Sequence, residues 1–365
     1  MAIYLLYAAS PIIMYIIMLM FGKTEINDNQ QQKKQYLVVM AVVMILMIGL
    51  RSPQIGSSDT MYYCSNWRYM SALNFTQFKQ ALDSIDLESG YLFCVWVLSH
   101  IFKDSQMLLV LSAIFFTVSI CRFVYYNCKD VVFPFLVFNC LGLFIFIIQG
   151  LRQGIAMCIC LWAFEKIKKN QHFKFIVLVL IAMLFHASAI VFFAIYILRY
   201  MKIKFSHIVF FVIASLIGLN LLPKIFGVMN VVINDDYKVG SGAESGGVVA
   251  ILIYMCIIFF ALITREKSNE KDKIKEDKNY DVFIYMAIIG VWALFARNMI
   301  SDIAERVGYY FAFSQMALVA NSIAVQKEKG TKVALAFLVS ALCLGVAVYK
   351  ASYSVIIPYE FFWQT

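Results

Sequence analysis

The stretch AIYLLYAASPIIMYIIMLMF, residues 2–21, contains no charged residue. A bilayer core about 30 Å thick needs roughly 20 apolar residues in an α-helix, so this stretch is long enough to cross it. It is too long for the core of a signal peptide, lacks a basic leader and has no clear small-residue cleavage site. We therefore expect it to be a retained first membrane span.

The composition of the whole chain agrees with this interpretation. Hydrophobic residues make up 62% and charged residues 15% of 365 residues, and the mean hydropathy is +0.78, far outside the range of soluble domains. Only helices and closed barrels satisfy the backbone inside a bilayer, and the long unbroken apolar runs favour helices. The sequence predicts an all-α polytopic membrane protein. Its nine cysteines form no CxxC pair, which argues against a disulfide framework and a zinc site.

Clusters of lysine separate the apolar runs and predict the topology. By the positive-inside rule, they mark cytoplasmic loops near 22–35, 165–174, 199–204, 265–280 and 327–332. The expected spans between them are 2–21, 36–50, 106–127, 131–149, 154–168, 205–222, 248–264, 281–296, 307–326 and 333–349.

Two further apolar stretches are assigned from the number of membrane crossings that the flanking loops require, which must be even between two loops on the same side. Residues 173–198 lie between two basic loops, so we expect two short helices that turn near His186. Residues 91–102 are expected to be a short or re-entrant segment on the outer side. This gives roughly twelve passes in a single transmembrane domain over 1–365. The expected outward loops lie near 51–90, 150–153, 223–247 and 297–306.

The arginines are distributed differently from the lysines. The positive-inside rule alone predicts that the outward loops contain few lysines and few arginines. Five arginines nevertheless fall at or near the outer face: Arg51, Arg68, Arg152, Arg297 and Arg306. Lysine is a hydrated point charge, whereas arginine presents a planar fork that binds phosphate bidentately. The arginines therefore indicate an anionic ligand near the outer membrane surface.

Arg152 is the foremost of these arginines. It lies with Gln149, Gly150, Gln153 and Gly154 in a break of an otherwise apolar run. A side chain that snorkels to the interface is the alternative explanation. Ionisable groups inside membrane proteins usually face the bundle interior or an aqueous cavity, and the small residues would let a ligand approach. We prefer a ligand contact.

Residues 51–70 combine aromatic, acidic and basic side chains after the second span. Aromatic faces stack on sugar rings and carboxylates accept sugar hydroxyls, which favours carbohydrate binding. An interfacial aromatic belt explains the same residue types equally well. The residues concerned are Arg51, Asp59, Tyr62, Tyr63, Trp67 and Arg68.

Three other positions carry groups that could do chemistry. His186 would suit a proton shuttle or a phosphate donor, or it merely hydrogen-bonds a neighbouring helix. Glu88 precedes a glycine and an apolar segment, so its carboxylate would lie at the outer edge of the membrane. The alternative explanation is an acid that only stabilises a helix N-terminus. Residues 297–311 supply Arg297, Asp302, Glu305, Arg306, Tyr309 and Tyr310, in which Asp302 and Arg306 could form a purely structural i,i+4 pair.

Several signatures are absent from the sequence. There is no Walker loop, GxGxxG, HExxH, GxSxG or DxD pair. We therefore expect no cofactor and no metal. We also expect no nucleic acid as a partner, because the orientation lysines explain the net charge of +9.

The order of these motifs resembles the EpsG-like branch of the Wzy-type oligosaccharide repeat-unit polymerases. The resemblance rests on Arg51 with Asp59 and Tyr62, Glu88-Ser-Gly-Tyr91, Arg152-Gln-Gly-Ile-Ala156, Phe185-His186-Ala-Ser188, Glu305-Arg306 with Tyr309 and Tyr310, and Pro358-Tyr359-Glu360. It implies a GT-C-like enzyme at the outer face of the bacterial inner membrane. Such enzymes join undecaprenyl-diphosphate-linked oligosaccharides into O-antigen, capsule or exopolysaccharide, and a chain-length regulator protein is an implied partner.

The resemblance also suggests roles for individual residues. A glycosyl diphosphate is already activated, so the protein needs to neutralise its leaving group and deprotonate the acceptor hydroxyl. We assign Arg152 and Arg306 to the diphosphate, with Arg51 and Arg297 as second candidates. Glu88 is the favoured base, and Asp59 and His186 are alternatives. The residues expected to contact the glycan are Tyr62, Tyr63, Trp67, Gln153, Tyr309 and Tyr310.

Other functions stay open from the sequence. A glycan ligase would give no ladder of repeat lengths. A flippase of lipid-linked glycan would need a polar path across the whole bilayer, whereas the candidate polar groups here cluster toward one face. An acyltransferase using His186 would need a cytoplasmic coenzyme entrance and a nearby acid, and neither is evident.

Overall fold

The computed structural model describes residues 1–56, 58–204, 206, 246–267, 278–297, 302–352, 354 and 356–364; the side chains of 58, 246–250, 266–267, 278 and 302–303 are not described. Every regular element in these ranges is a helix, and the nearest thing to a strand is an isolated bridge between Arg51 and Phe361. The predicted all-helical class is confirmed for this part of the chain.

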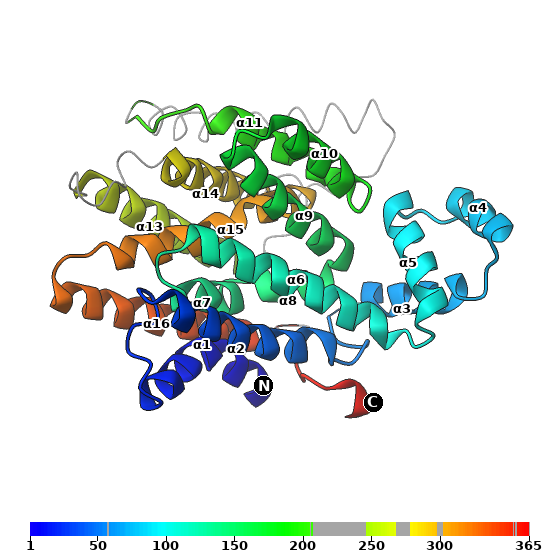
Figure 1. Cartoon of the computed structure of the whole chain (residues 1–365), viewed down its shortest axis with the longest axis horizontal. Coiled ribbons are helices and arrows are strands. Elements are labelled where there is room, and N and C mark those ends of the chain that lie inside the picture. The colour runs from blue at the N-terminus through cyan, green and yellow to red at the C-terminus, as the bar shows by residue number, and fades with distance from the viewer. Residues whose placement is uncertain are drawn as a thin grey trace. The chain divides into compact units, whose positions relative to one another are not determined.

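The chain divides into two compact units, residues Met1–Ile190 with Glu328–Thr365, and residues Val191–Lys327. The first unit contains α1 (Ala2–Met20), α2 (Gln30–Gly49), α3 (Ser58–Met70), α4 (Phe75–Ser84), α5 (Ser89–Ile101), α6 (Gln106–Asn127), α7 (Val132–Cys140), α8 (Leu143–Gln149), α9 (Leu151–Lys168), α10 (His172–Met183), α16 (Lys329–Ala351) and the 3-10 helix η2 (Phe362–Gln364) (Figure 1). The second unit contains α11 (Ala194–Leu198), α13 (Gly246–Lys267), α14 (Lys278–Arg297) and α15 (Asp302–Ala324). The 3-10 helix η1 (Ala187–Phe193) crosses the boundary.

Each unit is built by helix packing around apolar side chains. In the first unit, α1 packs on α2, α7 and α16, α2 packs on α6, and α9 packs on both α6 and α10. In the second unit, α13, α14 and α15 pack on one another, and α11 packs on α14. The apolar runs bury their side chains in these contacts, which is the main source of helix stability in a folded chain.

Five described helices, α1, α2, α6, α14 and α16, are long and apolar enough to cross a membrane. The pair α7 and α8 would be a sixth span if it is counted as one broken helix, because its two parts are bent by 56°. This supports a polytopic membrane protein. It does not reach the predicted count of roughly twelve passes, and the predicted span 205–222 lies almost wholly outside the described residues.

Glycines interrupt the apolar run that was predicted as the span 131–149. Gly142 has a φ of +109°, a conformation that residues with a Cβ rarely adopt, and it lies between the end of α7 at Cys140 and the start of α8 at Leu143. Gly150 then separates α8 from α9. The residues predicted as an outward loop at 150–153 are therefore mostly helical: Arg152 and Gln153 lie in the first turn of α9, which begins three residues before the predicted start at residue 154.

The region 51–90 was predicted as an outward loop, but it contains two helices, α3 and α4. Helix α4 starts with a capping box, in which the Asn74 side chain accepts from the Gln77 backbone and Gln77 bonds back to Asn74. Helix α5 is short and apolar, as predicted for 91–102. Its Ser89–Ile101 length of about 20 Å is less than a bilayer core.

The apolar stretch 173–198 does break near His186, as predicted. Helix α10 ends at Met183, residues 184–186 form a turn, and η1 begins at Ala187. The predicted outward loop 223–247 lies almost entirely outside the described residues, as do 298–301 of the predicted loop 297–306. Within the latter, Arg306 lies in α15.

Arg51 joins three segments of the first unit. Its side chain is only 1% exposed, and its two terminal nitrogens donate to the Ile55 carbonyl, to Thr60 Oγ1 at 3.4 Å and to the Ile148 carbonyl at 2.9 Å. Burial lowers the pKa of this guanidinium to about 10, so it stays charged at neutral pH. Arg51 thus ties the chain after α2 to α3 and to the end of α8.

The C-terminal segment packs against the end of α2 and the residues that follow it, beside Arg51. The Ser52 backbone N–H donates to the Glu360 carbonyl at 2.9 Å, and the Phe362 N–H donates to the Leu50 carbonyl at 2.9 Å. The Tyr359 hydroxyl donates to the Met47 carbonyl at the end of α2. The predicted motif Pro358-Tyr359-Glu360 therefore closes the fold beside Arg51.

We predict that Arg51→Lys lowers the free energy of unfolding by roughly 2–4 kcal/mol, because a lysine cannot reach all three buried acceptors at once. Thermal unfolding of the purified protein in detergent measures this. Arg68→Lys is the control, since Arg68 is exposed near the end of α3. Equal midpoints for the two variants would contradict a structural role for Arg51.

Candidate functional site

Arg152 lies at the centre of a polar cluster in the first unit. Its Nη1 pairs with Glu88 Oε2, its Nε donates to the Tyr63 hydroxyl at 3.0 Å, and its guanidinium lies 5.5 Å from the centroid of the Tyr63 ring. These residues come from α9, the start of α5 and α3. The side chains of Arg152 and Glu88 are 20% and 22% exposed, so the pair remains accessible from outside the protein.

The start of α5 explains why Glu88 is available to Arg152. Glu88 is the N-cap residue, but its side chain makes no capping hydrogen bond to its own helix. The carboxylate instead turns to Arg152. The alternative considered from the sequence, an acid that only stabilises a helix N-terminus, therefore does not account for its contacts.

Gly90 allows this helix start to pack against the turn before His186. The Tyr91 backbone N–H donates to the Leu184 carbonyl at 3.2 Å. A Cβ on Gly90 would lie 2.6 Å from Leu184 Cβ and 2.8 Å from the Leu184 oxygen, closer than real Cβ atoms approach. Three separated motifs, at residues 88–91, 152–156 and 185–188, thus come from segments that are in contact.

The N-terminus of α9 adds to the positive character around Arg152. The first backbone N–H groups of a helix have no partner within the helix, and they carry the positive end of its dipole. Gly150 is the N-cap and provides no side-chain cap. An arginine fork in the first turn of such a helix is a suitable arrangement for an anion with several oxygens.

Tyrosines form one wall of the cluster. The Tyr63 and Tyr91 rings meet edge to face at 5.5 Å, and Tyr62 lies 6.1 Å from Tyr63. Burial is the main reason that the pKa of the Tyr63 phenol is raised, so it stays protonated. The Tyr91 hydroxyl is buried and has no hydrogen-bond partner among the described residues. Sequence reasoning did not single out Tyr91, although its motif contained the signal.

The structure separates the other predicted residues of this unit. Tyr62 and Asp59 are exposed on α3 and can meet a ligand. Trp67 is fully buried, and its Nε1 donates to the Phe102 carbonyl at 3.1 Å, so it is a core residue here and not an open stacking platform. Gln153 is 2% exposed beside Arg152 in the first turn of α9. Arg51 is occupied by its own backbone contacts.

His186 lies in the turn that packs on the start of α5. Its Nδ1 is 2.6 Å from Ser188 Oγ, so the ring is held by a hydroxyl from its own segment. The turn places His186 two residues from Leu184, which contacts Gly90 and Tyr91. This keeps His186 among the candidates for proton transfer.

The second unit contains a similar set of side chains. Arg297 Nη1 lies 2.9 Å from Glu305 Oε2, and the Tyr309 hydroxyl donates to Glu305 Oε1 at 3.1 Å. The Arg297 and Glu305 side chains are 25% and 18% exposed. Arg306 is exposed and Tyr310 is buried. The predicted partner of Arg306, Asp302, has a side chain outside the described residues.

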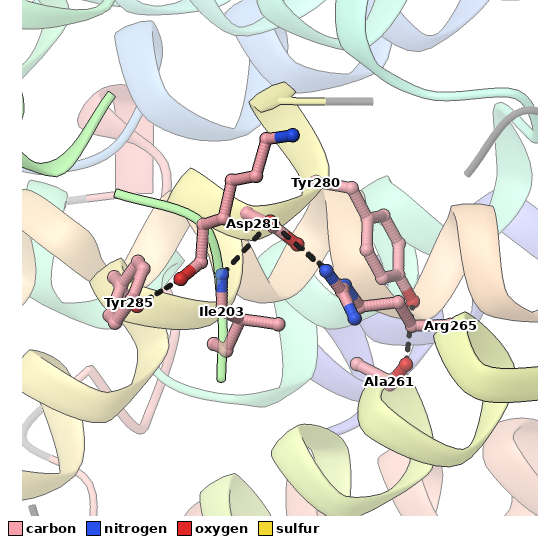
Figure 2. A network of polar contacts seen from close by, with 7 residues as sticks. Ile203, Ala261, Arg265, Tyr280, Asp281 and Tyr285 are labelled. Carbon is pink, nitrogen blue, oxygen red and sulfur yellow. Dashed lines mark hydrogen bonds and ion pairs between the residues drawn. The ribbon is translucent and has the colours of Figure 1, made fainter. Parts of the chain in front are cut away.

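A second polar network in this unit was missed by the sequence reasoning. Arg265 and Asp281 form a buried pair, with Nε 2.7 Å from Oδ1, and Asp281 also accepts from the Ile203 backbone N–H at 3.0 Å (Figure 2). Tyr280 donates to the Ala261 carbonyl, and Tyr285 donates to the Lys202 carbonyl. Arg265 had been grouped with the loop near 265–280, whereas α13 extends to Lys267 and α14 begins at Lys278. This network holds helix ends together.

Metal ligands do not gather in the described part of the chain. No group of three or more histidine, cysteine, aspartate or glutamate side chains there could hold a metal ion. The Arg152 cluster itself offers a guanidinium, a carboxylate, phenols and the N-terminus of a helix.

Together, the apolar helices and the half-buried arginine–glutamate cluster define an all-helical membrane protein with a candidate anion-binding site at helix ends. Comparison with protein families then identifies the family to which the chain belongs. The chain belongs to the EpsG family, whose sequence model matches residues 34–361 and so includes every residue of both clusters. This confirms the resemblance seen in the motifs and supports a polysaccharide polymerase-like role. Neither a curated protein nor a solved structure matches the chain.

We predict that Gly90→Ala destabilises the protein by about 1–3 kcal/mol, because the new Cβ would overlap the Leu184 backbone and push α5 away. The unfolding midpoint in detergent measures this. Gly345→Ala is the matched control: Gly345 lies in α16 with no atom within 4 Å of a built Cβ, so alanine there should be neutral or slightly stabilising. Equal effects of the two substitutions would refute the close contact.

Proposed function

We propose that the protein polymerises lipid-diphosphate-linked oligosaccharide repeat units into a surface polysaccharide. The observation that carries this proposal is the Arg152–Glu88–Tyr63 cluster, which offers a phosphate-binding fork beside a carboxylate in a chain of the EpsG family. The substrate we infer is an undecaprenyl-diphosphate-linked oligosaccharide, and the product is O-antigen, capsule or exopolysaccharide.

In this proposal, Arg152 and the N-terminus of α9 bind the diphosphate of the donor. The acceptor hydroxyl attacks the anomeric carbon, and the bond from that carbon to the diphosphate oxygen breaks. The leaving group departs as undecaprenyl diphosphate with the electron pair. A fixed guanidinium and helix N–H groups stabilise the charge that develops on it, without a metal.

Glu88 is the proposed base. Its ion pair with Arg152 couples binding of the donor diphosphate to deprotonation of the acceptor hydroxyl. Before the donor arrives, the carboxylate is occupied by the guanidinium. A diphosphate carries more negative charge than one carboxylate and draws Arg152 toward itself. Glu88 is then released to accept the proton of the acceptor hydroxyl. Asp59 and His186 remain the alternatives, since both lie on segments that join the cluster.

The remaining predicted residues take supporting places. Arg306 keeps its proposed place with Arg152 at the diphosphate, and Arg297 stays a second candidate, because it is paired with a glutamate and partly exposed, as Arg152 is. We propose a positioning role for Arg51 in place of diphosphate binding. The residues proposed to contact the glycan are Tyr62, Tyr63 and Tyr309, and the buried side chains of Gln153, Tyr310 and Trp67 would act from the core.

We also propose that the enzyme is a GT-C-like glycosyltransferase of the bacterial inner membrane, with its site facing outward and a chain-length regulator as partner. The separation of lysines from arginines along the chain supports this orientation. The side of the membrane predicted for each connecting segment, and the single transmembrane domain over 1–365, are part of the same proposal.

We predict that Arg152→Lys abolishes the polysaccharide ladder. Lysine keeps the charge but cannot contact a diphosphate bidentately while bonding Tyr63, and loss of such a donor costs about 10²-fold in rate. The measurement is a gel of lipid-linked glycan from a deletion strain that is complemented at matched expression. Arg68→Lys is the control and should restore the wild-type ladder.

The same strains separate the competing functions. A wild-type ladder with Arg152→Lys would remove Arg152 from the diphosphate site, and an unchanged ladder with Arg297→Lys would remove that second candidate. Single lipid-linked units that stay on the cytoplasmic side without the protein would identify a transporter and refute the polymerase.

We predict that Glu88→Gln lowers turnover about 10²-fold or more, as expected when a general base is lost, without raising the KM for the donor. The amide cannot take the proton, yet it no longer holds Arg152 by charge. Steady-state kinetics with purified lipid-linked units measures both constants. A raised KM with unchanged turnover would instead make Glu88 a positioning residue for Arg152.

A further inference from the structure

Arg122 stands apart from the other arginines of the first unit. It lies in the apolar helix α6, five residues before the helix ends at Asn127, which places it about 7–8 Å from that end. Helix α6 is one of the five candidate membrane spans. A charge at this depth needs a partner, because removing an ion from water is costly.

The partners of Arg122 are two aromatic rings. Its guanidinium carbon lies 4.8 Å from the Tyr126 ring centroid and 4.6 Å from the Trp162 ring centroid, the second on α9. Trp162 is itself fixed, because its Nε1 donates to Ser119 Oγ at 2.9 Å. Stacking on rings uses the faces of the guanidinium and leaves its N–H edges available for oxygen atoms.

No acceptor in the described ranges takes those N–H groups. Arg122 forms no hydrogen bond or ion pair with a described residue, and its Nε is buried without a partner. A second basic side chain, Lys166, lies one turn beyond Trp162 on the same face of α9. Its ammonium also forms no ion pair among the described residues.

The neighbouring charges do not compete for this position. Glu165 is buried and is held by Asn127 at 2.8 Å, with Lys168 3.5 Å away. Lys33 donates to the Cys128 carbonyl at 2.9 Å. The nearby carboxylate is therefore already used, whereas Arg122 and Lys166 are left with positive charge and no anion.

We propose that Arg122 and Lys166, framed by Tyr126 and Trp162, bind the phosphodiester headgroup of an anionic phospholipid. Tyr126 is 50% exposed, so the site opens on the outside of the bundle, where lipid lies. Tryptophan and tyrosine collect at headgroup depth, and basic pockets between membrane helices bind anionic headgroups. The lipid belongs to the leaflet next to the lysine-rich ends of α6 and α9. This site is separate from the Arg152 cluster.

The test uses the full-length protein, purified in detergent and depleted of lipid. Unfolding midpoints are measured with phosphatidylglycerol, with phosphatidylcholine and with inorganic phosphate. We expect phosphatidylglycerol to stabilise the wild type more than phosphatidylcholine does, and inorganic phosphate to have no effect. Arg122→Gln should raise the phosphatidylglycerol concentration for half-maximal stabilisation at least about tenfold, since charged hydrogen bonds are lost.

Two further variants make the result decisive. Lys169→Gln removes an exposed lysine at the same end of α9 and should behave as wild type. Arg122→Lys keeps the charge but loses the stacked fork, so it should weaken lipid binding several-fold, and it serves as the test where Arg122→Gln folds poorly. Equal stabilisation by both lipids, unchanged half-saturation in both Arg122 variants, or full stabilisation by inorganic phosphate alone would overturn the proposal.

Discussion

The ion pair between Arg152 and Glu88 is the interaction on which the candidate site depends. It joins residues 64 positions apart and brings together the start of α9, the start of α5 and, through Tyr63, helix α3. Two charges in a largely apolar protein are costly to bury unless each satisfies the other. The pair is nevertheless about one-fifth exposed, so it fixes the geometry while leaving the guanidinium open to a stronger anion.

Glycine makes this geometry possible in an otherwise bulky apolar chain. Gly90 lets α5 begin against the Leu184 backbone, and Gly154 lets α9 approach Phe116, whose ring would lie 3.1 Å from a built Cβ. Gly142 and Gly150 divide one long apolar run into α7, α8 and α9. A continuous helix would have no helix start near Arg152, and the positive dipole end that suits an anion would not lie there.

Much of the fold could be predicted because hydropathy sets helix length in a membrane. The short α5 and the break near His186 followed from charge parity, and the helix ends agree closely with the expected spans for α1 and α6. The partners of the polar residues could not be predicted in this way. Arg51 and Arg152 are the same residue type near the same face, yet one is held by carbonyl groups and the other by a carboxylate. Trp67 illustrates the same limit, because a tryptophan that stacks on sugar and one that fills a core have the same local sequence.

The contacts of each arginine show whether it is held by the protein itself or could bind a ligand. Arg265 with Asp281 is 9% and 5% exposed, and Arg51 is buried with both of its terminal nitrogens bonded to protein acceptors, so both side chains are committed to contacts within the protein. Arg152 and Arg297 have carboxylate partners that an incoming phosphate can replace, because these pairs are partly exposed. Among the described residues, Arg122 contacts ring faces only, which leaves its N–H edges for the oxygen atoms of the proposed lipid. One physical requirement, that a guanidinium in an apolar environment must find acceptors, therefore accounts for the packing of the fold, the proposed substrate site and the proposed lipid site.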